Sequence, residues 1–381
     1  MIETLRKLKR PKYKTFNKIQ IIRKNILSNL EYLQGLQKNA EIIPVLKSNA
    51  YGHGLKEMCQ ILNKTRVKMV AVDSFPEAQI VYKFSTKKVL IIGEMPKDVY
   101  KYCDFKRTEF CIYNLETFKH LSKFNKKIKI HLFVNSGMNR EGIQDLELFL
   151  KNIEQDLKKM EITGICSHFA SADEESKLNK EQEEKFLKDL EILKSKNINP
   201  KYVHLGNSAG IFILKNEIFS AFRVGISLYG YNIFPKNHPS FIKSKKLKPA
   251  LQLSSKITSI QKIKAGEKVS YNEKFKTEKN TTIATIPFGY YEGLDRRLSN
   301  KAEFLVKSAH KDFYAKIAGR VCMNLVSIDC SNNKIKIGDE VEIISPNKNT
   351  ENSVQNLAKK IGTIPYEVLV KLQGNIRREI I

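Results

Sequence analysis

The sequence lacks the features that mark several classes of protein. Its six cysteines are scattered and form no C-x-x-C pair, which argues against a zinc ribbon or a disulfide scaffold and fits a reducing cytoplasm. No apolar run approaches the roughly 20 residues of a transmembrane helix. The basic N-terminal stretch, residues 1–20, has no apolar core of the kind found in secretory signals. We therefore expect a cytoplasmic protein with no metal site and no membrane anchor.

Acidic residues are also scarce relative to basic ones. The formal net charge is +27, but the lysines are spread along the whole chain, with mild clusters only at residues 7–14 and 243–248. Nucleic-acid-binding proteins gather their cations on one face or in one arm. The diffuse pattern predicts no nucleic-acid partner, although it still favours anionic small molecules.

The order of apolar runs predicts the fold class. Eight short apolar segments alternate with amphipathic stretches over about 200 residues. This alternation is typical of a (β/α)8 TIM barrel, with a doubly wound sheet as the competing fold. The candidate strands are residues 41–48, 69–72, 89–93, 110–113, 129–135, 161–168, 202–207 and 221–226.

After Phe241 the pattern changes to alternating polar and apolar residues with frequent turn signals. We predict a mostly β domain over residues 245–381, with a short helix near "SVQNLAKKIG". Residues 1–244 would form the barrel, preceded by a lead-in strand within "NKIQIIRKN". No internal repeat is apparent. The expected architecture is an α/β barrel followed by a C-terminal mostly-β domain.

Unusual polar residues follow several of the predicted strands. The segment "PVLKSNAYGHG" places Lys47 at the end of the first strand, where a charge costs free energy unless it is paired or its pKa falls. Similar positions at later strand ends are held by Arg140, His168, Asn207, Ser208, Arg223, Gly225 and Ile226. Active sites of such barrels lie at the carboxyl ends of the strands. We therefore expect these side chains to share one rim.

The last two strand ends suggest a cofactor. Gly206, Gly210 and Gly225 leave backbone N–H groups open to an anion, as in the phosphate sites of many barrels; ordinary tight turns are the alternative. A phosphate site opposite a strand-end lysine fits pyridoxal 5′-phosphate (PLP), whose aldehyde forms a Schiff base with lysine.

These segments resemble a known family. "PVLKSNAYGHG" closely resembles the PLP-lysine signature of alanine racemases. The likeness continues in family order through "SGMNREG", "SHFASAD", "HLGNSAG", "FRVGISLYG", "VSYN", "IPFGYYEG", "GRVCMN" and "IPYE". The resemblance covers nearly the whole chain. It implies a PLP-binding barrel, a C-terminal β domain and a homodimer whose active sites are shared between subunits.

The resemblance also implies residue roles. Lys47 is the Schiff-base lysine and one catalytic base, and Tyr271 is the second base. Arg223 is the partner of the pyridine nitrogen, and His168 links it to the catalytic tyrosine. The other positions implied to contact cofactor or substrate are Tyr51, Ser208, Gly225, Ile226 and Tyr366 at the phosphate, Asn207 beside it, Arg140 at the phenolic oxygen and the substrate carboxylate, Met323 at that carboxylate, and Tyr290 and Arg296 at the entryway.

The chemistry explains these residue types. Racemisation removes the α-proton from one face and returns a proton on the other, so two bases on opposite faces of the external aldimine suffice. Arg223 cannot accept a hydrogen bond, which predicts an unprotonated ring nitrogen. We expect the cationic neighbourhood of His168 and Arg223 to help lower the pKa of Tyr271 from its reference value of about 10.

Two positions depart from the family pattern. Many members carry a carbamylated lysine seven residues before the arginine of the "GMxR" motif, and here that residue is Phe133. We therefore expect another group, a bound chloride or Asn135, to hold Arg140. An aspartate usually follows the "CM" pair, and here it is Asn324. Both changes affect the charges near the substrate carboxylate.

The sequence thus indicates an alanine racemase that supplies D-alanine for peptidoglycan. A racemase of broader specificity with the same fold is the alternative. A PLP decarboxylase of similar architecture would have an acidic residue at the ring nitrogen, which Arg223 argues against. A PLP carrier with a single barrel would lack the β domain and Tyr271.

Overall fold

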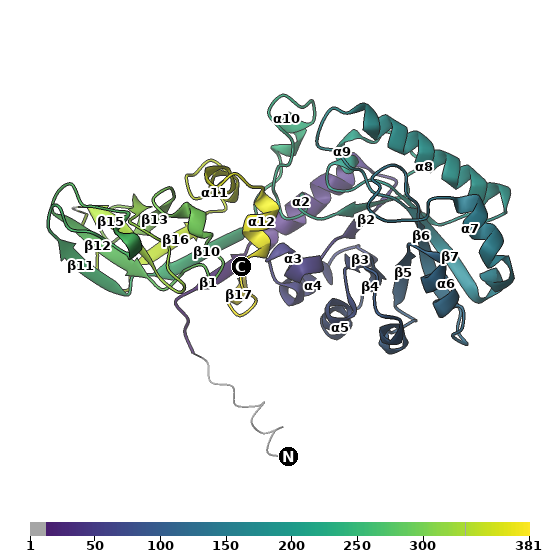
Figure 1. Cartoon of the computed structure of the whole chain (residues 1–381), viewed down its shortest axis with the longest axis horizontal. Helices are drawn as coiled ribbons and strands as arrows, with labels where there is room; N and C mark the ends of the chain where they lie inside the picture. Colours follow the sequence, from purple (N-terminus) through teal and green to yellow (C-terminus); the bar gives the residue numbers. More distant parts are fainter. Residues whose placement is uncertain (1–12, 332) are drawn as a thin grey trace, which may run out of the picture.

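The computed structural model describes residues 13–331 and 333–381, which form two lobes arranged along the long axis of the molecule (Figure 1). One lobe is a barrel of alternating strands and helices. The other is a β domain. Within these residues no helix has the length and hydropathy needed to cross a bilayer.

The barrel confirms the predicted fold class. Its parallel strands are β2 (Glu41–Pro44), β3 (Met69–Val72), β4 (Lys88–Ile91), β5 (Thr108–Ile112), β6 (Ile128–Phe133), β7 (Met160–Cys166), β8 (Tyr202–His204) and β9 (Ala221–Val224). Strands β3 to β8 form one sheet and β2 pairs with β9. The ring closes through a bridge between Val45 and Ala71 and a hydrogen bond from Arg223 N to Gly206 O of 3.0 Å.

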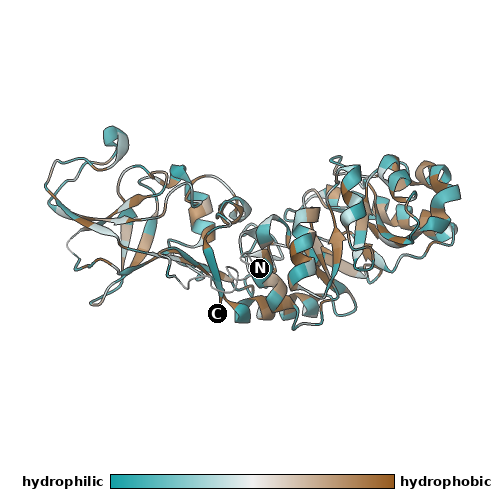
Figure 2. Ribbon diagram, turned by 90° about the horizontal axis from the view of Figure 1, so that it is seen from below, coloured by the Kyte–Doolittle hydropathy of each residue, from teal (hydrophilic) through white to brown (hydrophobic). Residues whose placement is uncertain are grey.

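Helices surround this barrel and cover its outer face, while side chains fill its interior. Each strand therefore buries both of its faces. All five residues of β5 are buried: Phe110 and Ile112 pack outward, whereas Cys111 packs into the barrel interior. Figure 2 shows apolar strands within this lobe and hydrophilic stretches on the surrounding helices. The helices of this lobe are α2 (Arg23–Leu36), α3 (Lys47–Tyr51), α4 (Leu55–Leu62), α5 (Phe75–Phe84), η1 (Lys97–Tyr102), α6 (Leu115–Leu121), α7 (Leu146–Ile153), η2 (Glu154–Lys159), α8 (Lys177–Ser195), α9 (Gly210–Ile213) and α10 (Phe241–Ser244).

The β domain is built on one large sheet of order β11-β12-β15-β14-β13-β16-β10-β1-β17. Its strands are β1 (Lys18–Ile21), β10 (Leu251–Lys256), β11 (Ser259–Ile263), β12 (Thr281–Ile286), β13 (Glu303–Lys307), β14 (Phe313–Ile317), β15 (Val326–Ser331), β16 (Glu340–Ile344) and β17 (Arg377–Ile380). The short helices are η3 (Tyr271–Glu273), η4 (Arg296–Leu298), α11 (Val354–Lys360) and α12 (Pro365–Val370). Helix α11 is the one expected near "SVQNLAKKIG".

The first strand of the chain belongs to this second sheet. The sequence predicts that the lead-in strand belongs to the barrel, but β1 pairs antiparallel with β10 and parallel with β17. The described part of the chain therefore enters the barrel from the β domain through α2. We propose that the return from barrel to β domain lies near residue 245, between β9 and β10.

Helix α12 joins the β domain to the barrel site. Gly52, after α3, has φ +78°, and a Cβ there would lie only 2.1 Å from the carbonyl oxygen of Leu369 in α12. Arg378 of β17 donates from Nε to the carbonyl of Gly52 at 3.0 Å. This close backbone approach brings Tyr366 of α12 to within 5.8 Å of the ring of Tyr51, measured between ring centroids.

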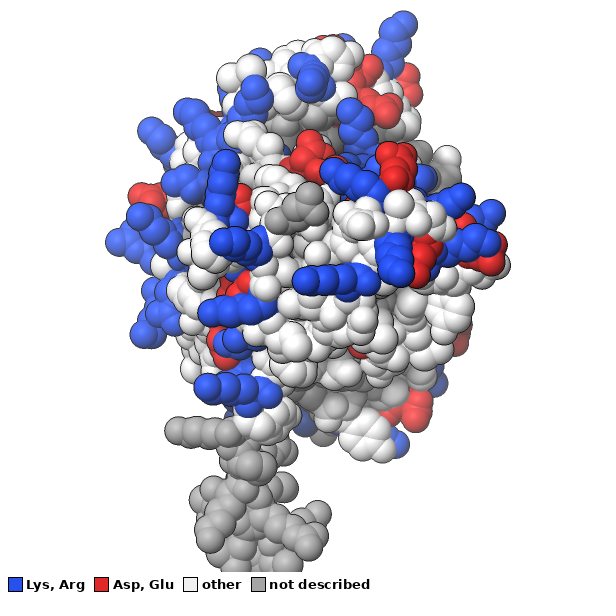
Figure 3. Space-filling model, turned by 90° about the vertical axis from the view of Figure 1, so that its left-hand side faces the viewer, with Lys and Arg blue, Asp and Glu red and all other residues white. Residues whose placement is uncertain are grey.

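The surface charge is diffuse over the end of the molecule that the β domain forms (Figure 3). Figure 3 shows the end of the molecule formed by the β domain, where basic side chains are spread over the face and acidic ones lie among them. On this face the cations form no single stripe of the kind that tracks a nucleic-acid backbone.

The junction at Gly52 predicts the effect of a single methyl group. Gly52→Ala should lower the free energy of unfolding by about 2 kcal/mol or more, because alanine is strained at this φ and its Cβ meets backbone. Gly35→Ala is the matched control: Gly35 lies within α2 with nothing within 4 Å of its added Cβ. That change should be neutral or stabilise by about 0.5–1 kcal/mol. Equal effects of the two substitutions in urea unfolding would contradict the close junction.

Candidate active site

A cleft of about 670 Å³ lies at the carboxyl ends of the barrel strands. Most of the residues singled out in the sequence line it together: Lys47, Tyr51, Arg140, His168, Asn207, Ser208, Arg223, Gly225 and Tyr366. Ile226 is fully buried in the core next to Gly225. Residues from the ends of different strands, and one from α12, thus converge on a single cavity.

Lys47 begins a left-handed turn. Leu46 is anchored by its N–H to the carbonyl of Ala71 at 2.7 Å, and the next residues, 48–51, have φ between 52° and 55°. A left-handed conformation costs about 1–2 kcal/mol per non-glycine residue. Hydrogen bonds hold the turn: Glu77 Oε1 accepts from Ser48 N at 2.6 Å, and Asn49 Oδ1 accepts from Leu55 N at 2.9 Å.

The ammonium group of Lys47 is paired. It lies 3.3 Å from Asp73 Oδ1, and the Lys47 side chain is 39% exposed. Glu77 also fixes Asp73, because Glu77 Oε2 accepts a hydrogen bond from the backbone N–H of Asp73 at 2.8 Å. The cost of a charge at this strand end is therefore offset by an ion pair and by solvent.

Hydroxyl groups gather on the other side of the cleft. Ser208 Oγ accepts from the N–H groups of Gly225 at 2.9 Å and Ser227 at 3.3 Å. Gly225 lies against Tyr51, since an added Cβ would be 2.5 Å from the phenol oxygen. Burial raises the pKa of Tyr51 to about 12, with a further contribution from Asp73, and burial also raises the pKa of Tyr366. Both phenols are therefore protonated donors that suit a phosphate group.

Arg223 is buried at the floor of the cleft. Its guanidinium lies 2.6 Å from Nδ1 of His204 and 3.3 Å from Nδ1 of His168, and it donates to the carbonyl of Ser167. Burial, with the charges of Arg223, Arg140 and Lys47, lowers the pKa of His168 to about 3. His168 is thus neutral, and the positive charge of the His168–Arg223 neighbourhood belongs to the arginine alone.

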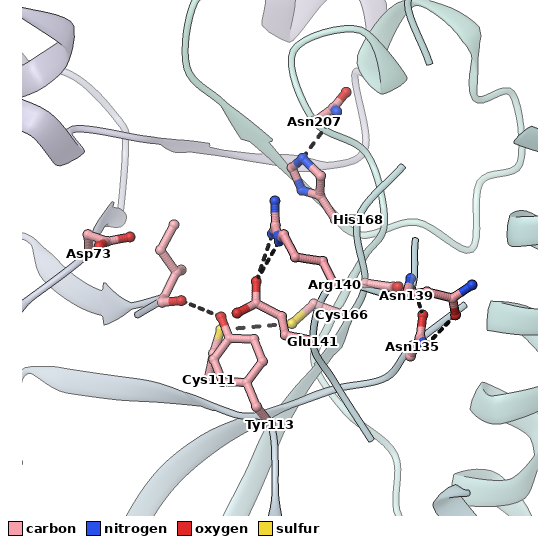
Figure 4. Close-up of polar contacts among 12 residues, drawn as sticks. Asp73, Cys111, Tyr113, Asn135, Asn139, Arg140, Glu141, Cys166, His168 and Asn207 are labelled. Carbon is pink, nitrogen blue, oxygen red and sulfur yellow. Dashed lines mark hydrogen bonds and ion pairs between the residues drawn. The ribbon is translucent and has the colours of Figure 1, made fainter. Parts of the chain in front are cut away.

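Asn207 connects this floor to the last strands. Its amide nitrogen lies 3.5 Å from Nε2 of His168, as the close-up in Figure 4 shows. Its Oδ1 accepts from the N–H groups of Ala209 and Gly210 at 3.0 and 2.9 Å. The side chain therefore fixes the turn that leads into α9.

Arg140 is held by its neighbour Glu141. The Nε and one terminal nitrogen of Arg140 lie 3.1 and 2.7 Å from Glu141 Oε1 (Figure 4). Asn135, our protein candidate for this role, instead donates to Asn139 at 2.8 Å and Gln144 at 3.0 Å. The expectation for Asn135 is therefore wrong, because a carboxylate adjacent in sequence supplies the negative partner.

Phe133 fills the space that a longer polar side chain would occupy. Its ring packs on Tyr113 with the ring centroids 4.8 Å apart, and Tyr113 donates to the carbonyl of Ile92. Both rings belong to the barrel interior. The wall of the cleft beneath Arg140 and Glu141 is thus apolar.

Apart from Tyr366, the β-domain residues singled out in the sequence do not line this cleft. Tyr271, Tyr290 and Met323 are exposed by 66%, 42% and 55%. They lie on neighbouring loops, because Tyr290 N donates to Cys322 O at 3.0 Å and Ser270 Oγ to Arg320 O at 2.8 Å. Arg296 opens the short helix η4 of the same domain. Asn324 donates to Glu292 Oε1 at 2.8 Å. Within one chain, Lys47 and Tyr271 are therefore separate.

Sequence reasoning missed several charged neighbours. Asp73 pairs with Lys47, Glu77 holds the turn after Lys47, and Glu141 holds Arg140. His204 contacts Arg223. A signal was present for His131 and His204, which are histidines within the otherwise apolar runs "KIHLFV" and "YVHL". The acidic residues carried no such signal, because their partners come from other strands or loops.

The buried histidines predict a loss of stability in acid. Burial lowers the pKa of His53, His131, His168 and His204, to about 3 for His53 and His168. Unfolded histidines protonate near pH 6.5, so below that pH the unfolded state binds more protons. The stability is complete above pH 6.5 and is lost as the pH falls towards the folded pKa. The free energy of unfolding should drop between pH 7 and 5, by up to about 1.4 kcal/mol per pH unit for each imidazole.

Two variants separate this effect from general acid sensitivity. His53→Phe keeps a ring stacked on Tyr229, whose centroid is 4.3 Å away, and should make the pH dependence shallower. His310→Ala removes an exposed imidazole and should leave it unchanged. The same slope in urea unfolding for His53→Phe and for the parent would show that His53 is not held neutral.

The chain matches family models and relatives of known function along most of its length. Residues 21–233 match the family model "Alanine racemase, N-terminal domain" and residues 250–380 match "Alanine racemase, C-terminal domain". The chain is 33% identical to the alanine racemase of Clostridium novyi over 364 residues, which covers 93% of this chain and 92% of that protein. It is 35% identical to the alanine racemase of Borreliella burgdorferi over 362 residues, covering 91% and 93%.

Solved structures agree with these matches. The alanine racemase of Bacillus anthracis with bound L-Ala-P superposes with a TM-score of 0.88 at 28% identity, covering 97% of this chain and 96% of that one. That of Bartonella henselae with covalently bound pyridoxal phosphate gives a TM-score of 0.83 at 26% identity, covering 97% and 100%. The chain belongs to the alanine racemase family.

Proposed function

We propose that this protein interconverts L-alanine and D-alanine with PLP as cofactor, and so supplies D-alanine for peptidoglycan in the cytoplasm. One observation carries the proposal: a strand-end lysine, two half-buried protonated tyrosines and a buried arginine line the same cleft. Family membership supports the racemase activity. The relatives with bound L-Ala-P and with covalently bound pyridoxal phosphate support the substrate and the cofactor.

The residues present fit the cofactor. Lys47 would hold it covalently. Tyr51, Ser208, Gly225, Ile226 and Tyr366 would hold its phosphate, with Asn207 fixing the adjacent turn. Gly225 leaves the room that the phenol of Tyr51 needs at this end of the cleft, because any Cβ there would clash with Tyr51. When bound, PLP supplies the electron sink that makes an α-proton of an amino acid removable.

Each remaining group of this chain has a defined task. Lys47 would hold or release a proton at its Nζ on one face of the substrate, and Tyr271 would do so at its phenol oxygen on the other. Arg223 donates without accepting, which keeps a ring nitrogen beside it unprotonated. Arg140 and the backbone N–H of Met323 would bind the substrate carboxylate, and Tyr290 would line the entry. His168, neutral, would connect Arg223 to Tyr271.

This division of tasks requires a second subunit. Tyr271, Tyr290, Tyr291, Met323 and Leu325 are each more than 40% exposed, and such a group of large apolar side chains is typical of an interface. We infer a two-fold homodimer in which the β domain of one subunit covers the barrel cleft of the other. Each site would then combine Lys47 of one chain with Tyr271 of its partner.

Mixing two inactive variants tests this arrangement. Lys47→Ala should lose covalent PLP and nearly all activity, whereas Tyr271→Phe should keep the yellow colour of the bound cofactor and lose activity. After subunit exchange, about half the dimers are mixed and each has one intact site, so activity should return to about one quarter of the parent value. A chain with both substitutions, mixed with Lys47→Ala, is the control and should restore nothing. Exchange without recovery would place both bases on one chain, and a protein that takes up no PLP would refute the cofactor.

The Arg140–Glu141 pair makes a second prediction for the substrate side. Glu141→Gln should raise the KM for alanine about fivefold with PLP still bound, since a partly exposed ion pair contributes up to about 1 kcal/mol. Glu147→Gln on α7 is the control and should leave KM unchanged. Because Glu141 supplies the negative partner, parent activity should not depend on dissolved carbon dioxide or on exchanging chloride for a bulky anion. Dependence of the parent on either would show that another anion holds Arg140.

A further inference from the structure

A line of buried polar groups crosses the barrel interior beneath the cleft. Glu109 on β5, His131 on β6, His204 on β8 and Arg223 on β9 have exposed fractions of 1%, 0%, 0% and 5%. Glu109 Oε2 lies 3.1 Å from Nε2 of His131. Nδ1 of His131 lies 2.6 Å from Nε2 of His204, and Nδ1 of His204 lies 2.6 Å from Arg223. The contacts are continuous from a carboxylate to a guanidinium.

Hydrogen-bond chemistry gives this line one direction. Arg223 can only donate and the Glu109 carboxylate can only accept. Arg223 therefore donates to Nδ1 of His204, whose Nε2–H donates to Nδ1 of His131, whose Nε2–H donates to Glu109. Both imidazoles must be neutral and carry their proton on Nε2. No other tautomer of either ring satisfies all three contacts.

The charges agree with this assignment. Burial alone would raise the pKa of Glu109, but hydrogen bonds from His131 and Thr163 and the charge of Lys88 lower it to about 2, so the carboxylate is ionised. Burial lowers the pKa of His131 and His204, so both rings are neutral. Among the described residues, no carboxylate forms an ion pair with Arg223 directly. The line therefore joins a buried anion to a buried cation through two neutral rings.

The barrel interior is shaped around these rings. A Cβ on Gly164 of β7 would lie 2.4 Å from Nδ1 of His131, so only glycine leaves room for that ring. On its other side, His131 stacks on Tyr202 with ring centroids 5.3 Å apart. At the far end, Glu109 Oε1 pairs with the partly exposed Lys88 at 3.2 Å, while Oε2 faces the line. An ion pair between Glu109 and Lys88 alone would need neither Gly164 nor the contact of Glu109 Oε2 with His131.

We propose that Glu109 is a remote positioning residue that acts through His131 and His204 to orient Arg223 and to balance its buried charge. The inference rests on the proposed function in one respect, that Arg223 faces the ring nitrogen of the cofactor. The arrangement supplies a counter-charge for the arginine without placing an acid beside that nitrogen, where an acid could protonate it. Glu109, His131 and His204 touch neither the cleft nor its contents.

Histidine tautomers measured by nuclear magnetic resonance on ¹⁵N-histidine-labelled protein without cofactor provide the first test. In the parent, both rings should carry the proton on Nε2 and stay neutral over the pH range in which the protein is folded. Glu109→Leu leaves the Nε2–H of His131 without an acceptor, and it should shift the ¹⁵N resonances of His131 and, through the hydrogen bond between the rings, those of His204, which does not touch Glu109. Glu109→Gln keeps an acceptor oxygen and should retain the parent tautomers. A parent ring with its proton on Nδ1, or a change confined to His131, would overturn the relay.

A double-mutant cycle tests the charge coupling without any cofactor and without relying on the leucine variant. Urea unfolding is compared for the parent, Glu109→Gln, Arg223→Met and the double variant. The loss from Glu109→Gln should be clearly smaller when Arg223 is already replaced, because the carboxylate then has no guanidinium to balance. Glu161→Gln, on strand β7 of the same barrel, is the control and should show additive effects with Arg223→Met. Additivity for Glu109 would mean that it is only a structural partner of Lys88.

Loading with PLP separates this proposal from the proposed function. In the loaded enzyme, Glu109→Leu should reduce kcat about tenfold or more with little change in KM for alanine, because a misplaced Arg223 affects the reacting ring and leaves the carboxylate site intact. Glu109→Gln, which keeps an acceptor oxygen, should lose less of kcat. A parent protein that takes up no PLP would refute the proposed function, while the tautomers and the cycle would still decide the relay. A changed KM with kcat retained would contradict the positioning role.

Discussion

A permanent positive charge at the centre of the barrel is the constraint on which the rest of the site depends. The Arg223 guanidinium is only 5% exposed, and burying an uncompensated charge costs several kcal/mol. The interior is therefore not a uniform apolar filling. The guanidinium faces four acceptors: the carbonyls of Ser167 and His204 and the Nδ1 atoms of His168 and His204. The Glu109 carboxylate ends the line of hydrogen bonds that begins at Arg223 and passes through His204. Burial, together with this charge, keeps the pKa of His168 low and the ring neutral.

The second constraint is backbone geometry at the junction of the two lobes. The left-handed turn after Lys47 and the close approach of Gly52 to α12 bring the phenols of Tyr51 and Tyr366 near each other at one end of the cleft. The hydroxyl groups that suit a phosphate thus come from two domains. Because β1 and β17 pair in the same sheet, both ends of the described chain reinforce this junction. The cleft is therefore a product of the domain arrangement as much as of the barrel.

The sequence predicted the architecture because the determinants of a barrel are local. Segments of four to eight residues placed each strand to within a few residues, and strand ends located Lys47, His168 and Arg223 on one rim. The sequence did not reveal which residues hold the charged side chains of the site in place. Phe133 excluded a carbamate, yet nothing in the local pattern distinguished Glu141 from Asn135 as the residue that holds Arg140. The sequence also carried no sign of the role proposed for Glu109, because that role depends on side chains of β6, β8 and β9. Only closure of the barrel brings those side chains near Glu109.

The ion pair between Lys47 and Asp73 reconciles a stable apoprotein with a reactive lysine. Both side chains are well exposed, by 39% and 52%, and such pairs contribute at most about 1 kcal/mol. A deeply buried pair would cost several kcal/mol to break and would compete with any bond that the lysine is to form. Here the lysine is held at the mouth of the cleft by a turn that fixes its backbone, while its charged end is only loosely retained. The rigid elements of the site surround Arg223 and the hydroxyl groups, and the one group proposed to bond covalently is the one left easiest to release.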